Sequence, residues 1–221
     1  MTFAAAYENP PSVWGVGRLV VDGEVVPWAV SQDDIDDEAD SQAARLAALG
    51  VGAGDLVLIV SLLSQAIHIV PLEKAAGRLG ALYSSADATP ADARRTASLI
   101  RQLEPVAVVG VSASVLEGLD ELGLDPAEVF GPVGAIATAD EIARDALVAA
   151  GLAPRRWVKL GPTSAWEETP GTVSYDAPRW QADDDAGEIV LTNVASRLTP
   201  CEQFRTSVRG RVVAPGTIAL D

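Results

Sequence analysis

The first clear pattern along this chain is a pair of short apolar runs separated by turn residues. The runs at 18–21 and 24–28 flank Asp22-Gly23, a dipeptide typical of tight turns between antiparallel strands. This pattern predicts a β-hairpin. The residues before it, which include Pro10 and Pro11, predict an irregular opening.

A helical period follows the hairpin. Ser31 and Asp34 resemble a capping box, and apolar residues then recur at three- and four-residue spacing until Gly50. We therefore predict a helix from Ser31 to the residue before Gly50. Its first turns carry an acidic run over 33–40, and such runs usually form solvated helix starts or loops.

Buried strands and amphipathic helices then alternate. Continuous apolar runs predict strands at 56–61, 80–84, 106–111, 134–137, 156–160 and 187–192. Helical spacing and capping residues predict helices at 64–78, from Thr89-Pro90 to Glu104, at 112–122, and from a second capping box, Thr138 with Glu141, to Gly151. Because parallel neighbours need crossover connections, this alternation predicts an α/β fold with a mostly parallel β-sheet flanked by helices.

The regular pattern divides the chain into three parts. Residues 1–160 form the predicted α/β domain, 161–186 are predicted to be an irregular aromatic and acidic loop, and 187–221 contain a terminal strand. Trp157, Trp166, Tyr175 and Trp180 gather around the loop, where packing onto the sheet is the expected role and a binding surface the alternative.

Composition narrows the class of protein. The 221 residues include 16 Lys and Arg against 31 Asp and Glu, and the net charge of −15 disfavours nucleic acid and anionic lipid as partners. The apolar stretch at 56–72 is interrupted by polar residues and is too short to span a membrane. Since Met1–Tyr7 lacks the features of a secretory signal and Cys201 is the single cysteine, we expect a cytoplasmic protein.

Catalytic side chains are scarce. His68 is the single histidine and lies in an apolar helix, so we expect a core or interface histidine rather than a general base. One histidine and one cysteine also argue against histidine or thiolate metal sites. The sequence thus predicts no catalytic residue, no metal site and no cofactor.

One stretch resembles a known family. The segment from Ala44 to Val57, which contains Leu49-Gly50-Val51 and Gly54-Asp55, is similar to the L-x-x-L-G-V-x-x-G-D-x-V stretch of acyl-CoA synthetases and other adenylate-forming (AMP-binding) enzymes. Gly80-Ala81-Leu82-Tyr83 and Thr89-Pro90 also follow that family's pattern. The resemblance is clearest over 30–112, and it implies the first α/β subdomain of the family's large N-terminal domain.

The family's phosphate loop, T-S-G-T-T-G-x-P-K, is degenerate in this chain. If the strand at 187–192 is its lead-in, only Thr192, Ser196 and Pro200 echo the motif, while Val194 and Arg197 stand where glycine is expected and the lysine is missing. Glycines let a loop aim its amide N–H groups at phosphate oxygens, so these positions are at most vestigial. This alignment, which we favour at the level of sequence, needs no large deletion.

A second alignment remains open. The segment 161–165 resembles the later family motif Y-G-x-T-E, and 204–208 resembles Y-R-T-G-D, which would make the chain a relative with its middle deleted. The motif glutamate associated with the metal would then be Ser164, and the aspartate that binds ribose hydroxyls would be Val208. Both alignments imply a degraded ATP site.

These observations predict a non-catalytic acyl-CoA-synthetase-like domain, a pseudoenzyme that acts as a binding or assembly component. The alternative is a subunit of an acyl-CoA ligase system whose ATP site is supplied by another chain. Under the first alignment the sequence stops before the family's second subdomain, so we expect a homo-oligomer or a protein partner to cover apolar residues on the helices at 64–78 and 112–122. These residues are Leu63, Ile67, Val70, Val115, Leu116 and Leu119. The sequence identifies no small-molecule ligand.

Overall fold

The computed structural model describes residues 13–21 and 23–221, and it divides the chain into two compact units. The first unit contains the chain up to Ser41 together with Ser64–Pro71 and Val158–Asp221, and the second contains Gln42–Leu63 and Leu72–Trp157. The predicted domain at 1–160 is therefore not one unit, because its first 41 residues belong with the C-terminal third. The predicted irregular opening and Asp22 of the hairpin turn lie outside the described residues.

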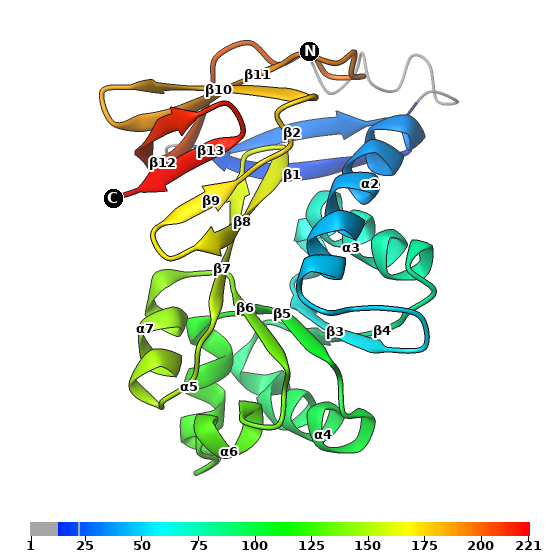
Figure 1. Cartoon of the computed structure of the whole chain (residues 1–221), viewed down its shortest axis with the longest axis vertical. Helices are drawn as coiled ribbons and strands as arrows, with labels where there is room; N and C mark the ends of the chain where they lie inside the picture. Colours follow the sequence, from blue (N-terminus) through cyan, green and yellow to red (C-terminus); the bar gives the residue numbers. More distant parts are fainter. Residues whose placement is uncertain (1–12, 22) are drawn as a thin grey trace. The chain divides into compact units, whose positions relative to one another are not determined.

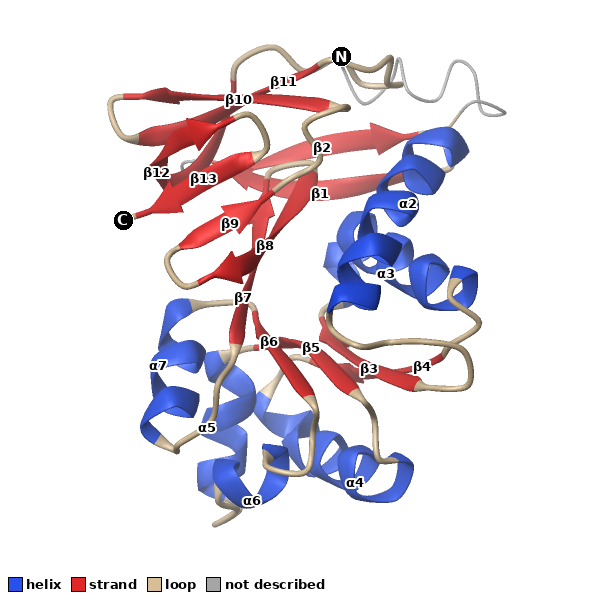
Figure 2. Ribbon diagram, in the orientation of Figure 1, coloured by secondary structure: helices blue, strands red, loops and turns tan. Residues whose placement is uncertain are grey.

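The second unit contains the parallel sheet that the sequence predicts (Figures 1 and 2). Its strand order is β4-β3-β5-β6, with the first residues of β7 beside β6. The strands are β3 (Leu56–Ser61), β4 (Leu82–Asp87), β5 (Ala107–Val111), β6 (Ala135–Thr138) and β7 (Arg155–Leu160). The helices are α4 (Ala93–Leu103), α5 (Ala113–Glu121), α6 (Pro126–Phe130) and α7 (Glu141–Ala149), with the C-terminal parts of α2 (Gln32–Ala48) and α3 (Ala66–Arg78). Short 3-10 turns, Leu63–Gln65 and Pro90–Asp92, precede α3 and α4.

The central strands of this sheet are buried on both faces. Leu58, Val60 and Val108 pack into one core with residues of α4, α5, α6 and α7. Val57 and Ile59 point to the opposite face, since successive strand residues alternate, and they are also at most 1% exposed. Burial on both faces explains why β3 and β5 read as continuous apolar runs in the sequence.

Helix starts follow the predicted capping chemistry in part. Ser31 Oγ accepts from the amide of Asp34 at 3.0 Å, and Asp34 Oδ2 accepts from the amide of Ser31 at 2.8 Å, so the first capping box is confirmed. The second is wrong: Asp140, not Thr138, caps α7 by accepting from the amide of Ala143. The short helix α6 was not predicted, although Asp125 at its N-cap and Pro126 at its first position carry the signal.

The first unit is largely antiparallel. The hairpin of β1 (Gly15–Val21) and β2 (Glu24–Val30) is confirmed. A run of strands in this unit has the order β8-β9-β13-β12-β11-β10, with antiparallel pairing at each junction. Its strands are β8 (Thr163–Thr169), β9 (Thr172–Ser174), β10 (Trp180–Asp185), β11 (Glu188–Asn193), β12 (Phe204–Ala214) and β13 (Thr217–Leu220). The irregular loop predicted at 161–186 is thus wrong, because three strands occupy it.

The core of the first unit explains why the sequence predicts a loop where three strands form. Trp180 and Val173 are buried in it on strands too short and too polar on their outer face to give a strong apolar run, and Tyr175 is buried directly after β9. All four aromatic residues expected to pack onto the sheet are at most 5% exposed, so the packing role is confirmed: Trp157, Trp166, Tyr175 and Trp180. Among the described residues no helix is long and apolar enough to cross a membrane.

The residues expected to need cover by a partner are mostly buried in the chain itself. Val115, Leu116 and Leu119 belong to the core of the second unit. Ile67 is buried in the core of the first unit, and Val70 packs against it. Of the six, Leu63 alone is well exposed, at 93%, so that argument for a partner does not hold for the other five.

Candidate functional site

The three vestigial phosphate-loop positions lie on or beside the loop that joins β11 to β12. Thr192 is in β11, and its hydroxyl accepts a hydrogen bond from the amide of Gln203 at 3.1 Å. Ser196 and Pro200 are exposed in the loop itself. The structure therefore places all three in one segment, but no helix begins behind it, because the loop leads into the 11-residue strand β12.

The ends of this loop are tied together at Asn193. Its backbone N–H donates to the carbonyl of Cys201 at 2.9 Å, and its side-chain oxygen accepts from the amide of Cys201 at 2.5 Å. Its side-chain NH2 donates to the carbonyl of Ala195 at 2.7 Å. Thr199 adds a fourth contact, a hydrogen bond of 2.6 Å from its hydroxyl to the carbonyl of Ala29. These bonds close the loop into a narrow turn.

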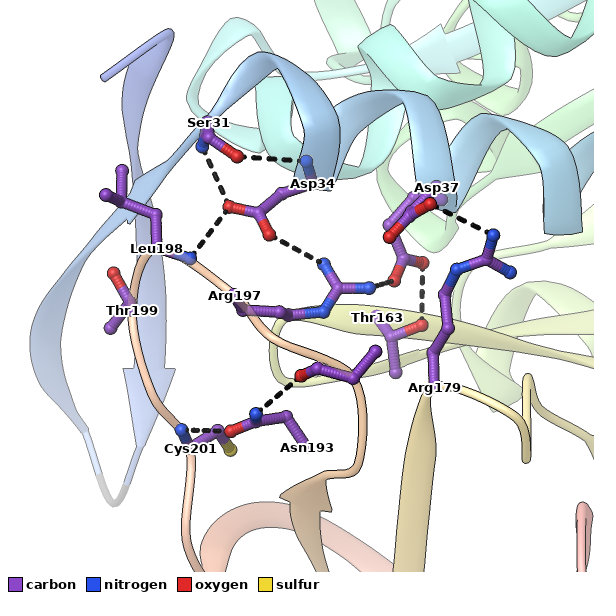
Figure 3. A network of polar contacts seen from close by, with 12 residues as sticks. Ser31, Asp34, Asp37, Thr163, Arg179, Asn193, Arg197, Leu198, Thr199 and Cys201 are labelled. Carbon is purple, nitrogen blue, oxygen red and sulfur yellow. Dashed lines mark hydrogen bonds and ion pairs between the residues drawn. The ribbon is translucent and has the colours of Figure 1, made fainter. Parts of the chain in front are cut away.

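Arg197 fixes the middle of the loop to helix α2 (Figure 3). Its guanidinium lies 2.6 Å from Glu38 Oε1 and 3.8 Å from Asp34 Oδ1, and the side chain is 4% exposed. The guanidinium carbon also lies 4.4 Å from the centroid of the Trp180 ring, a cation–π arrangement. The residue that replaces a motif glycine is therefore a buried anchor.

Glu38 is the centre of the buried network. Besides Arg197, its carboxylate accepts from the Thr163 hydroxyl at 2.7 Å and from the Trp180 indole N–H at 3.0 Å. Burial raises the pKa of Glu38, and the nearby Arg197 charge and the two neutral donors oppose that rise. Four elements far apart in the sequence thus meet at one carboxylate, which requires the loop, β8 and β10 to hold their positions against α2.

The acidic run over 33–40 differs from its predicted solvated state. Asp34 and Glu38 are 4% and 5% exposed, one turn apart on α2, and both face the loop. Asp37 receives a hydrogen bond from Arg179 at 3.0 Å, and Arg179 also binds Asp176 at 2.8 Å. The sequence did not indicate these roles because it cannot show which residues face the helix from distant strands.

The residues of the second alignment also gather in the first unit. The Phe204 ring packs directly over Gly161, where an added Cβ would lie only 2.4 Å from a ring carbon. Ser207 occupies the glycine position of Y-R-T-G-D, and its φ of 59° is in the left-handed region that favours glycine. It lies at a register shift between β11 and β12, as expected for a β-bulge.

The positions that the second alignment assigns to the metal and the ribose hold other chemistry. Ser164 is 5% exposed, and its hydroxyl lies 3.4 Å from His68 Nδ1. Val208 packs against the core of the first unit. Burial, with a smaller contribution from the Lys159 charge, lowers the pKa of His68 to about 3, so the ring is neutral and enclosed as expected for a core histidine. Among the described residues no group of three or more His, Cys, Asp or Glu could hold a metal ion.

Comparison with solved structures assigns the fold. The chain superposes on 2-hydroxyisobutyryl-CoA ligase in complex with 2-HIB-AMP and CoA with a TM-score of 0.73 and 16% identity, covering 95% of this chain and 56% of that one. The chain has the acyl-CoA ligase fold. ATP-bound MatB from Rhodopseudomonas palustris matches with a TM-score of 0.63 and 13% identity over 96% of this chain and 48% of that one. The Klebsiella oxytoca NpsA N-terminal subdomain, in complex with 3-hydroxyanthranilyl-AMSN, matches with a TM-score of 0.64 and 14% identity over 93% and 61%.

These matches have a defined scope. The chain spans about half to three-fifths of the length of the ligases that it matches, and the NpsA match lies within an N-terminal subdomain. No protein-family model and no curated protein sequence matches the chain. At 11–16% identity this similarity shows the fold alone, and the chemistry has to be argued from the residues present.

Proposed function

We propose that this chain is a non-catalytic acyl-CoA-ligase-like domain that serves as a binding or assembly component. The observation that carries the proposal is Arg197, which under the first alignment stands at a glycine position of the family's phosphate loop and anchors that loop to Glu38 by a buried ion pair. A loop held from within in this way is a structural connection between strands.

The hydrogen-bonding groups of the loop support this proposal. A phosphate loop binds its ligand with free amide N–H groups. Here the amides of Val194 and Ala195 donate to the carbonyl of Arg179, that of Leu198 donates to Asp34, and that of Cys201 donates to Asn193. Nucleotide binding would require these internal bonds to break, and each broken bond costs about 0.5–1.5 kcal/mol.

The charges around the loop also disfavour nucleotide binding. Asp34 and Glu38 supply two carboxylates that face the loop, against the single guanidinium of Arg197. A phosphate group that replaced the loop at this position would meet two carboxylates and one guanidinium, in an already acidic protein. These charges therefore disfavour a bound phosphate.

The second alignment, under which 192–200 is not the phosphate loop, is the alternative for the C-terminal third and leads to the same proposal. In the family both of its motifs flank one nucleotide, so they have to be close in space, and here Gly161 and Phe204 are in contact. The left-handed backbone at Ser207 supports the same assignment, since that position is glycine in the motif. Under this alignment Ser164 and Val208 replace the metal-associated glutamate and the ribose-binding aspartate, so the ATP site is degraded in this case too.

A role in assembly draws support from apolar side chains that the chain leaves exposed. Leu63, Leu82 and Ile142 are 93%, 63% and 72% exposed, and Tyr83 beside Leu82 on the edge strand β4 is 48% exposed. A homo-oligomer or a partner protein would cover such residues, so light scattering of the purified chain should give a mass above 22.9 kDa. A monomer at high concentration, with no stoichiometric partner from its own host, would count against assembly.

Catalytic competence is tested by acid-dependent pyrophosphate exchange with Mg-ATP across a broad panel of carboxylic acids. We expect no exchange above the enzyme-free rate for the chain alone, because the positioned donors that adenylyl transfer needs are absent or internally bonded. Exchange with any acid would overturn the proposal. Exchange that requires a second chain would instead identify a subunit of a ligase system.

A further inference from the structure

The second unit contains a groove of about 780 Å³ that is independent of the loop described above. Residues of α4 line one wall, and residues of α6 and its flanking segments line the other. The volume lies in the range of small-molecule sites, roughly 300–1,000 Å³. The alternating strands and helices of the sequence gave no indication of it, because the wall opposite α4 belongs to the short helix α6 that was not predicted.

One wall presents a line of hydrogen-bond donors. Arg94, Ser98 and Arg101 line the groove from successive turns of α4, at i, i+4 and i+7, over a length of about 10 Å. Among the residues that the structure describes, neither arginine has an ion-pair partner. Two unpaired guanidinium groups on one groove are notable in a chain with nearly twice as many acidic as basic residues.

The opposite wall is apolar. Leu124, Val129 and Val133 line the groove and are packed against the core of the second unit, so their positions are fixed. Ile100, which is 3% exposed, adds to the apolar surface from the α4 side. A ligand with an apolar body would bury that body here while its polar group faces the donors of α4.

Two carboxylates limit the charge that the groove accepts. Glu104 and Glu128 line it together with the two arginines, so the lining is neutral overall. A doubly charged phosphate would be repelled by the glutamates, whereas a single negative charge can lie beside an arginine. Glu104 is the C-cap of α4, and its φ of 47° is the left-handed conformation in which many helices end.

We propose that the groove between α4 and α6 binds a small amphipathic monoanion, with its apolar body on Leu124, Val129 and Val133 and its head group on Arg94 or Arg101. This site would give the binding component proposed above a ligand, but it uses residues of the second unit alone. The failure of either proposal therefore leaves the other intact.

The test uses octanoate and octanesulfonate as probes, at concentrations below their micellar range, with the whole chain. Backbone amide NMR should show shifts confined to α4 and the segment from Leu124 to Val133, and calorimetry should give saturable binding. Octanol and octylammonium, which have the same chain but no negative charge, should bind at least ten-fold more weakly. Across the carboxylate series from butanoate upwards, each additional CH2 that fits the groove should raise affinity about four-fold.

Matched variants separate the site from nonspecific attraction. Arg94→Gln or Arg101→Gln, whichever removes the guanidinium that holds the head group, should weaken octanoate binding about five-fold, as expected for one solvent-exposed ion pair. Arg211→Gln removes the same charge from an exposed position on β12 and should leave binding unchanged. Shifts spread over both units, equal binding of octylammonium, or insensitivity to both α4 variants would overturn the proposal. Absence of saturable binding by either probe would overturn it as well.

Discussion

Replacing Arg197 should destabilise the first unit more than any surface substitution, because the change leaves a buried carboxylate without its counter-charge. The substitution Arg197→Met removes the guanidinium and roughly keeps the apolar stem of the side chain. Glu38, which is 5% exposed, then loses its 2.6 Å ion pair and keeps only the hydrogen bonds from Thr163 and Trp180. Removing one partner of a buried pair costs about 3–5 kcal/mol.

Two features of the structure reduce the expected loss of stability. Arg197 Nε has no hydrogen-bond partner among the described residues, so part of the cost of burying the guanidinium disappears with the side chain. The two remaining neutral donors also lower the energy of the unpaired Glu38 carboxylate. We therefore expect a loss of about 3 kcal/mol in the free energy of unfolding, at the lower end of the range for buried pairs.

The pH dependence of the variant gives an independent check. Burial already raises the pKa of Glu38, and loss of the Arg197 charge raises it further. The folded state of the variant then binds a proton more tightly than the unfolded state does, so the penalty is fully present at neutral pH and is relieved as the pH falls toward the usual glutamate value. Relative to the parent chain, Arg197→Met should therefore recover stability on acidification.

The assay is equilibrium urea unfolding followed by tryptophan fluorescence at neutral and mildly acidic pH. The double variant Glu38→Gln with Arg197→Met is the matched control, because it removes both charges and should lose less than the single arginine variant. A loss below about 1 kcal/mol for Arg197→Met, with no pH dependence, would mean that the ion pair is not buried in solution. The anchored-loop interpretation would then be wrong.

Three further predictions concern local structure. Ser207→Gly should raise the free energy of unfolding by about 0.5–1 kcal/mol, because glycine adopts the left-handed backbone at that bulge without strain, and a decrease in urea unfolding would contradict this. Asp140→Ala should lower it by about 1–2 kcal/mol through loss of the α7 cap while Asp140→Asn retains most of it, and equal stability of the two variants would exclude a capping role. The His68 ring signals in NMR should not titrate between pH 8 and 5, since its pKa lies at about 3, and a midpoint near 6.5 would show that the ring is solvated.

The sequence predicted the second unit well because its signals are local. Strand β3 reads as an unbroken apolar run since it is covered on both faces, and the predicted Leu56–Ser61 matches the observed bounds. The capping box of Ser31 and Asp34 likewise needs only four consecutive residues. Helix α6 escaped prediction because five residues are too few to show a helical period.

Most of the first unit and its site could not be predicted, because they depend on contacts between residues far apart in the chain. A single sequence does not show which of these residues meet. Strand β10 reads Trp180-Gln181-Ala182 and then three aspartates, which looks like a loop until β11 pairs beside it. Arg197 was recognised as a lost glycine, but its partner Glu38 lies 159 residues away, so the ion pair could not be predicted. The sequence does place Asp34 and Glu38 one turn apart on the same helix, and this spacing could have suggested that both face a common partner.

Calorimetric titration of the whole chain with Mg-ATP tests whether the loop after β11 binds nucleotide. We predict no saturable heat, which corresponds to a Kd weaker than about 1 mM or a binding free energy below about 4 kcal/mol in magnitude. A micromolar Kd that is lost on substitution of Thr192 or Ser196 would contradict the account, because it would require the loop amides and hydroxyls to be free for phosphate.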